Sequence, residues 1–311
     1  MTNEQRKVVV GVDFSPESEI AARQALEICR REGHELVLVY ADAVVEIPPV
    51  SDSPSPEVRK AVDAYRAQLV SALESLRERL GDLRERLSDQ GVTVSQVVVE
   101  DAPAAGICAV AAELQAHLTV VGAHGGGGLP WLPVGNVATG VVRLCETDVL
   151  VARASRTHRP GYRAIAVGTD FSASAERALE TAVGLASPGA QVDVLHCASF
   201  GPEVFSGFGV VEPLPVPVRQ LLIDDLRVQG EQLIARHRRE GVSLAFHVSS
   251  DRPVAGLSHW AETRSCDLLA VGSHGRRGIR RLVLGSVAES MLKRSPCSVL
   301  VSHGLPASAK G

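Results

Sequence analysis

Short apolar runs alternate along the chain with longer stretches that carry the three-to-four-residue spacing of amphipathic helices. The stretch 16–32, PESEIAARQALEICRRE, is typical of the helical pattern, and Pro16 stands at an early position that helices favour. Apolar runs of this length fit strands that are buried on both faces of a parallel sheet. The expected strands are 7–12, 36–40, 94–99, 118–122 and 148–152 in the first half, and 164–168, 191–196, 244–248, 268–272 and 298–302 in the second.

The same pattern occurs twice. VVVGVDFS (8–15) returns as IAVGTDFS (165–172), and TDVLVA (147–152) returns as CSVLVS (297–302). Each copy alternates strands and helices, which predicts an α/β fold of two tandem doubly wound domains, each a five-stranded parallel sheet between helices. The expected limits are 1–153 for the first domain, 154–163 for a linker, 164–305 for the second domain and 306–311 for a tail.

One predicted helix, 57–90, carries leucines whose spacings alternate between three and four residues. That rhythm also occurs in coiled coils, but the run covers few heptads. We therefore expect a single long helix whose leucine stripe packs on the sheet. The stripe consists of Leu69, Leu73, Leu76, Leu80, Leu83 and Leu87.

Bulk composition excludes several classes of protein. The formal charge of −4 gives no reason to expect a nucleic-acid binder. No apolar run approaches the ~20 residues of a membrane-spanning helix, and the polar start MTNEQRK shows no signal peptide. We expect a cytoplasmic protein with no membrane or nucleic-acid partner.

The cysteines are scattered, with no C-x-x-C pair and no His/Cys cluster at metal-ligand spacing. They are expected to be reduced and mostly buried, and no metal site is predicted. They are Cys29, Cys108, Cys145, Cys197, Cys266 and Cys297.

The candidate chemistry lies in GSHGRRGIRRLVLGS (272–286), which begins at the end of a predicted strand. Gly272 and Gly275 allow backbone amides to approach a ligand closely, and Gly285-Ser286 reads as the start of a helix, where free amides favour an anion. Arg276 is one of four arginines between Gly275 and Gly285. Asp170, after the first strand of this copy, would lie at the same sheet edge and accept hydrogen bonds from a base or ribose.

Other nucleotide motifs are missing. No G-x-G-x-x-G follows the first strand and no P-loop motif occurs, which argues against a dinucleotide-binding protein and against a P-loop NTPase. His124 and His274 sit inside the glycine turns, one in each copy. A local hydrogen bond that holds the turn is the favoured role for these imidazoles, and no neighbouring nucleophile supports a catalytic triad.

The motif G-x2-G-x9-G-[S/T], together with DFS after the first strand and SPCSVLV at the last, resembles the universal stress protein family over nearly the whole chain. The resemblance implies a Rossmann-like fold of the adenine nucleotide alpha hydrolase-like type, and ATP as ligand, with Mg²⁺ as an open option. It also implies pairing of the two copies through their last strands. Carried over by position, the ligand-binding residues are Asp170, Gly272, Gly275, Gly285, Ser286 and Val287 in the second copy, and Asp13, Gly122, Gly125 and Gly135 in the first.

The first copy departs from the motif at Asn136, which stands where the second has Ser286, and its loop GGGGLPWLP lacks a cationic side chain. Nucleotide binding is therefore expected to be stronger in the second copy.

The favoured function is a regulatory ATP-binding protein of stress or dormancy, not an enzyme. In it, nucleotide occupancy alters the loops 42–60 and 201–217 and, through them, an unidentified protein partner. A slow ATPase or phosphotransferase, and a scaffold with decayed sites, remain as alternatives. A homodimer of the whole chain is a further option.

Overall fold

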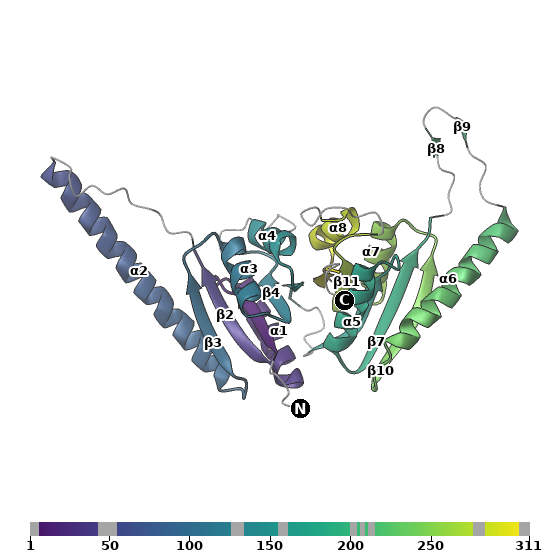
Figure 1. Ribbon diagram of the computed structural model, residues 1–311, viewed down its shortest axis with the longest axis horizontal. Coiled ribbons are helices and arrows are strands. Elements are labelled where there is room, and N and C mark those ends of the chain that lie inside the picture. The colour runs from purple at the N-terminus through teal and green to yellow at the C-terminus, as the bar shows by residue number, and fades with distance from the viewer. Residues whose placement is uncertain are drawn as a thin grey trace.

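The computed structural model describes residues 6–42, 55–125, 134–154, 161–199, 215–275 and 284–304, together with the short strands β8 (Val204–Phe205) and β9 (Gly209–Val210). Two α/β halves follow each other along the chain (Figure 1). The first half contains β1 (Lys7–Gly11), α1 (Pro16–Glu32), β2 (Glu35–Ala41), α2 (Pro56–Ser88), β3 (Val94–Val99), α3 (Pro103–Glu113), β4 (Leu118–Gly122), α4 (Asn136–Leu144) and β5 (Asp148–Ala152). The second contains β6 (Tyr162–Gly168), α5 (Ala173–Leu185), β7 (Ala186–Cys197), α6 (Val216–Arg236), β10 (Val242–Ser249), α7 (Pro253–Thr263), β11 (Leu268–Gly272), α8 (Ser286–Arg294) and β12 (Ser298–Ser302).

Within each half the strands of the main sheet are parallel and their order reverses once, as in doubly wound folds, whereas β8 and β9 form a separate antiparallel pair. The sheet order is β10-β7-β6-β11-β12-β5-β4-β1-β2-β3. The chain moves outward from β1 to β2 and β3, then returns to the other side of β1 with β4 and β5. The switch points therefore lie between β1 and β4 and between β6 and β11, where ligands bind in such sheets.

The last strands of the two halves join them into one sheet of ten strands within the described residues. β12 pairs with β5 in antiparallel register, with Leu300 opposite Leu150. Both leucines are fully buried. The pairing of the two copies implied by the sequence is confirmed, and it covers two apolar strand edges that would otherwise be exposed.

Polar contacts at this seam differ on its two sides. Asp148 of β5 is buried and accepts hydrogen bonds from Arg177 Nε at 3.1 Å and Thr181 Oγ1 at 2.5 Å, both on α5. Burial raises the pKa of the Asp148 carboxyl, against the opposing effect of Arg177. Ser298 of β12 occupies the position that corresponds to Asp148, and its Oγ donates a hydrogen bond to Gln24 Oε1 of α1 at 3.2 Å. A charged contact on one side thus matches a neutral one on the other.

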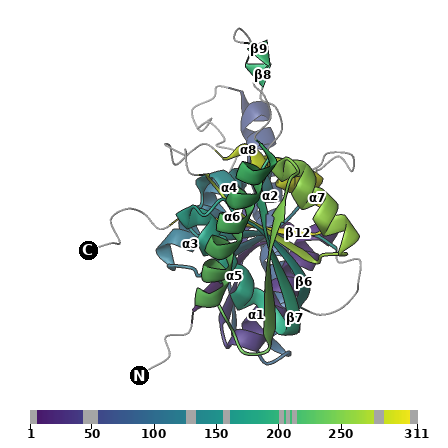
Figure 2. The same cartoon turned by 90° about the vertical axis from the view of Figure 1, so that its right-hand side faces the viewer.

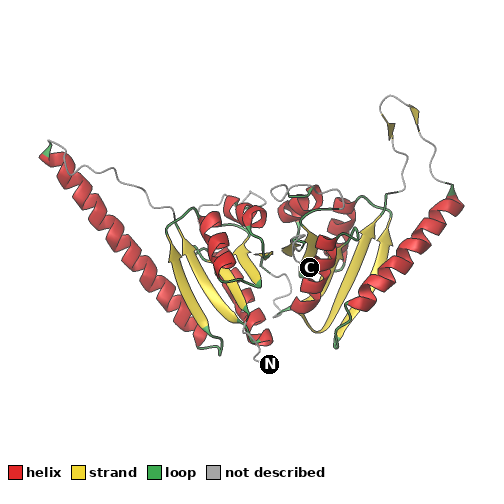
Figure 3. Ribbon diagram, viewed as in Figure 1, coloured by secondary structure: helices red, strands yellow, loops and turns green. Residues whose placement is uncertain are grey.

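Helices cover both faces of the sheet (Figures 2 and 3). One apolar cluster joins α1, α2, α5 and α6 to one face, and a second joins α3, α4, α7 and α8 to the other. Because each cluster extends across both halves, the ten strands share two continuous core layers.

Only the second half of the leucine stripe on α2 packs on the sheet. Leu80, Leu83 and Leu87 are buried, whereas Leu69 and Leu73 remain partly exposed. The N-terminal part of α2 extends beyond the strands (Figure 1). The expectation that the whole stripe packs on the sheet therefore holds for its C-terminal half.

The fold class is confirmed, and most strand limits lie within two residues of those expected. β6 begins at Tyr162, inside the expected linker, and β7 begins at Ala186 rather than at 191. Residues 155–160 of the expected linker and the expected tail 306–311 lie outside the described residues.

None of the helices that the structure describes combines the length and the apolar character needed to cross a membrane.

Candidate nucleotide-binding site

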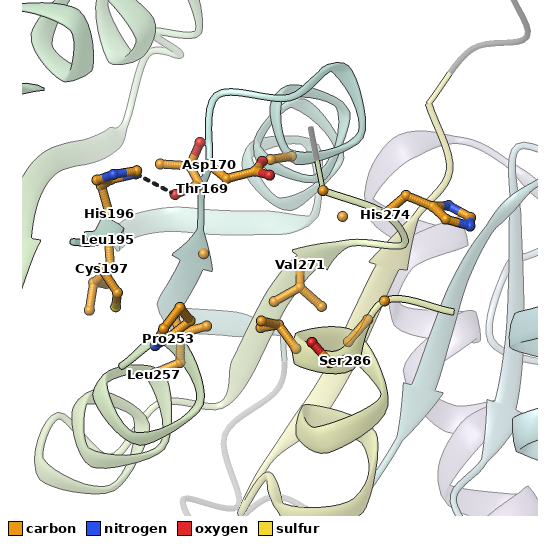
Figure 4. A pocket seen from close by; sticks show the side chains of 17 residues that line it. Thr169, Asp170, Leu195, His196, Cys197, Pro253, Leu257, Val271, His274 and Ser286 are labelled. Carbon is orange, nitrogen blue, oxygen red and sulfur yellow. Dashed lines mark hydrogen bonds between the residues drawn. The ribbon is translucent and has the colours of Figure 1, made fainter. Parts of the chain in front are cut away.

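A pocket of about 240 Å³ opens at the carboxyl ends of β6 and β11, the switch point of the second half. Figure 4 shows Asp170 and Ser286 on opposite sides of it. The predicted site residues Asp170, Gly272, Gly275, Gly285, Ser286 and Val287 all line this pocket, together with Gly168, Thr169, Ala175, Leu195, His196, Cys197, Pro253, Leu257, Val271, His274 and Ala288.

Asp170 is held by a tight turn between β6 and α5. Its Oδ1 accepts a hydrogen bond from Ser172 N at 3.0 Å, and Thr169 Oγ1 accepts one from Phe171 N at 3.0 Å. Between them, Phe171 adopts a φ of 61°, a left-handed conformation that is uncommon for a bulky residue. Such backbone strain is concentrated at functional sites. Here the hydrogen bond from Ser172 N holds the carboxylate at the pocket edge.

The two glycines of the turn after β11 are needed for different reasons. A Cβ on Gly272 would lie 2.8 Å from the backbone of Ser174 and Ala175, so this glycine lets the start of α5 pack against the strand end. Among the residues that the structure describes, a Cβ on Gly275 would meet only the Oδ2 of Asp170, at 2.9 Å. Gly272 therefore maintains the packing, whereas Gly275 keeps space open beside Asp170.

The N-terminus of α8 forms the opposite wall. Gly285 is the N-cap and its N–H donates to Ser273 O at 2.8 Å, which ties the helix start to the glycine turn. Ser286 is the first helical residue and is exposed. Because Gly285 has no side chain to cap the helix, the first-turn amides are left for a ligand or solvent.

Two histidines lie at the pocket and make local contacts. His274 Nδ1 lies 2.9 Å from Ser273 Oγ, and the carbonyl of His274 accepts a hydrogen bond from Ser174 Oγ at 2.5 Å. His196 Nδ1 lies 2.8 Å from the Thr169 carbonyl, and its ring packs 5.0 Å from that of Phe171. The interpretation of His274 as a turn-holding residue agrees with these contacts.

The first half repeats the backbone of this site. Phe14, after Asp13, also has a φ of 61°, and Asp13 accepts from Ser15 N at 3.0 Å. A Cβ on Gly122 would lie 2.8 Å from the α1 backbone, and one on Gly125 would lie 2.5 Å from Asp13 Oδ2.

Gly135 caps α4 and donates to Ala123 O at 2.8 Å, and Asn136 is the first residue of that helix, exposed like Ser286. The structure thus brings together the predicted residues of each copy. Arg276 and the rest of both glycine loops, 126–133 and 276–283, lie outside the described residues.

Sequence reasoning missed the wall that α7 contributes. Pro253 and Leu257 line the pocket, and Leu257 also packs against Gly168 at the end of β6. The repeat of APAAGI (102–107) as RPVAGL (252–257) was the available signal, because a repeated segment beside a strand end indicates a shared structural position.

Comparisons with known proteins agree with this architecture. A family model described as "Universal stress protein family" matches residues 4–153 and 161–303. Universal stress protein Rv2005c of Mycobacterium tuberculosis is 38% identical over 148 residues, which cover 48% of this chain and 45% of that protein. Universal stress protein Rv2623 of the same species is 36% identical over 154 residues, covering 50% and 47%. The matched segment thus spans about half the length of these relatives.

Two solved structures share the fold over nearly their whole length. A universal stress protein from Archaeoglobus fulgidus has a TM-score of 0.69 at 19% identity and covers 96% of this chain and 99% of its own. One from Pseudomonas aeruginosa has a TM-score of 0.62 at 15% identity, covering 96% and 94%. At these identities the similarity concerns the fold alone. Since the family model matches almost the entire chain in two consecutive segments, this protein belongs to the universal stress protein family and carries two of its domains in tandem.

Proposed function

We propose that the second domain binds an adenine nucleotide, ATP in the first place, and that occupancy of this site regulates a protein partner during stress. The observation that carries the proposal is the convergence of Asp170, the glycine turn and the first turn of α8 on one pocket. A carboxylate on one side accepts from a base or ribose, and helix amides on the other side attract phosphate.

The size of the pocket supports a nucleoside-sized group. At about 240 Å³ it lies just below the ~300–1,000 Å³ of drug-sized ligand sites. Its apolar wall, Leu195, Leu257 and Val271, suits a planar base. The phosphates would extend toward Ser286, and Arg276, next to Gly275 in sequence, would add positive charge.

We further propose that the first domain binds nucleotide more weakly. Its site has the same backbone arrangement, but the bulkier amide of Asn136 replaces the hydroxyl of Ser286 at the helix start. Mg²⁺ alongside ATP, a cytoplasmic location and a homodimer of the whole chain belong to the same proposal.

Ser286→Asp is expected to abolish most of the nucleotide-dependent stabilisation without harming the fold. An acidic residue in the first turn of a helix is itself favourable by ~0.3–1 kcal/mol, and Ser286 is exposed, so the ligand-free variant should be at least as stable as the wild type. Its negative charge would repel phosphate. The measurement is the melting temperature with and without ATP, ADP and AMP. A ligand at 100 times its Kd stabilises a selective site by about 2.7 kcal/mol.

The matched control is Asn136→Asp, which places the same charge at the corresponding position of α4. It should leave most of the shift intact if the second domain is the stronger site. A wild-type protein whose melting temperature is unchanged at millimolar adenine nucleotide would overturn the proposal, and equal shifts in wild type and Ser286→Asp would place the ligand elsewhere.

A further inference from the structure

Two cysteines that are 37 residues apart in sequence meet in the first domain. Cys108 lies on α3 and Cys145 is the C-cap of α4, and their Sγ atoms are 2.6 Å apart. A disulfide bond is ~2.05 Å long, so the sulfurs need to approach by only about half an ångström to form one.

The helices that carry the pair are packed closely enough to tolerate the link. A Cβ on Gly140 of α4 would lie 2.8 Å from the Cβ of Ala104 on α3, so the absent side chain lets the two helices approach. Cys145 is buried, whereas Cys108 is partly exposed and gives an oxidant access to the pair.

The pKa of one thiol in this pair is lowered, which distinguishes the pair from three other cysteines of the chain. The contact with Cys108 lowers the pKa of the Cys145 thiol, and the same contact raises that of Cys108. Burial raises the pKa of Cys29 and of Cys266 to about 12 and that of Cys197 to about 11. Because the thiolate is the reactive form, the pair loses a first proton more readily than these three.

We propose that Cys108 and Cys145 are a peroxide-sensitive dithiol that closes to a disulfide between α3 and α4. The Cys145 thiolate attacks hydrogen peroxide that enters past the partly exposed Cys108. The O–O bond breaks, a sulfenic acid forms on Cys145, and the leaving hydroxide takes the thiol proton of Cys108 and departs as water. The Cys108 sulfur then displaces the hydroxyl group, the S–S bond forms, and the hydroxide leaves as a second water with the proton that the pair released on ionisation. Two thiols and one peroxide thus yield one disulfide and two waters.

The consequence is confined to the first domain. In the second, Ser258 and Ser295 occupy the matching positions on α7 and at the end of α8, and Ser295 instead caps its own loop through Cys297 N at 3.3 Å. In the second domain α7 and α8 line the pocket, and their counterparts in the first domain are α3 and α4. The disulfide would therefore fix the spacing of α3 and α4 beside Asp13 and Gly125, and it would leave the second domain unchanged.

The test treats the reduced, folded full chain with hydrogen peroxide, alkylates the remaining thiols and maps peptides without reductant. A peptide linking Cys108 to Cys145 is expected, reversible by dithiothreitol and formed before Cys29 is modified. Cys108→Ser and Cys145→Ser should both lose it, and the first should accumulate a dimedone-reactive sulfenic acid at Cys145. Both variants should fold, because the second domain carries serine at the same positions.

The control Cys29→Ser should keep the linked peptide. Peroxide that leaves both thiols alkylatable in the native protein, or a link that forms only after denaturation, would overturn the proposal. The test involves no nucleotide, so its outcome is independent of the proposed function.

Discussion

Leu300→Ala is expected to lower the free energy of unfolding by roughly 3–5 kcal/mol and to weaken both domains together. Leu300 is fully buried in β12 and lies opposite Leu150 of β5, across the only antiparallel pairing among the sheet's described strands. Both leucines belong to the apolar cluster that runs along one face of all ten strands. Truncation would therefore leave a cavity at the boundary of the two domains, not inside one of them.

Hydrogen exchange measured strand by strand checks this expectation. In Leu300→Ala the amides of β5 should lose protection along with those of β12, although the substitution lies in the other domain. Leu150→Ala should have an effect of similar size by pseudo-symmetry. Leu268→Ala removes an equally buried side chain from β11, one strand further from the seam, and should affect β5 less. Wild-type protection of β5 in Leu300→Ala would mean that the domains are stabilised independently.

Local patterns in the sequence predicted the strands well, and they failed where long-range pairing decides the limits. β7 begins five residues before the expected start, at Ala186, because Ala186 pairs with Tyr162 ahead of a register shift in the β6–β7 ladder. The intervening Pro188 and Gly189 are typical of a turn, and Gly189 indeed has a φ of 78°. No local rule indicates that a strand continues through such a segment.

The sequence predicted which residues meet at the candidate site, but it did not predict the structural role of each one. The sequence motif placed Gly272 and Gly275 together at a ligand, whereas the structure assigns Gly272 to close packing against α5. The strained φ of Phe171 had no sequence signal, since aromatic residues do not favour that conformation. Likewise, Cys108 and Cys145 were expected to be ordinary buried cysteines, because nothing in their spacing shows that α3 and α4 bring them into contact.

Acidification from pH 6.5 to 4 is expected to remove several kcal/mol of stability through two histidines near the domain boundary. Burial, with His274 nearby, lowers the pKa of His303 to about 4. Burial, aided by Arg6 and His34, likewise lowers the pKa of His117 to about 4. His303 follows β12, and its buried Nε2 has no hydrogen-bond partner among the described residues. Both imidazoles are therefore neutral in the folded protein and disfavour protonation there.

The sign follows from proton linkage. Each folded pKa lies below the usual value of 6.5, so the unfolded chain binds more protons between pH 6.5 and 4. The stabilisation is complete above pH 6.5 and is lost as the pH falls toward 4, by roughly 2–3 kcal/mol for His303 and by less for His117, which is only partly buried and is screened by solvent. The raised pKa of Asp148 acts in the opposite sense, because the folded state gains from protonating that carboxyl as the pH falls toward 3.8.

Urea unfolding at several pH values between 7 and 4 measures the effect. His303→Gln should remove more than half of the pH dependence, because a neutral amide cannot take up the proton, and His117→Gln should remove a smaller part. His259 is exposed and similarly solvated in both states, so His259→Gln should leave the slope unchanged. A wild-type stability that is constant over this range, or a full slope in His303→Gln, would show that the boundary between the domains admits the charged imidazole without cost.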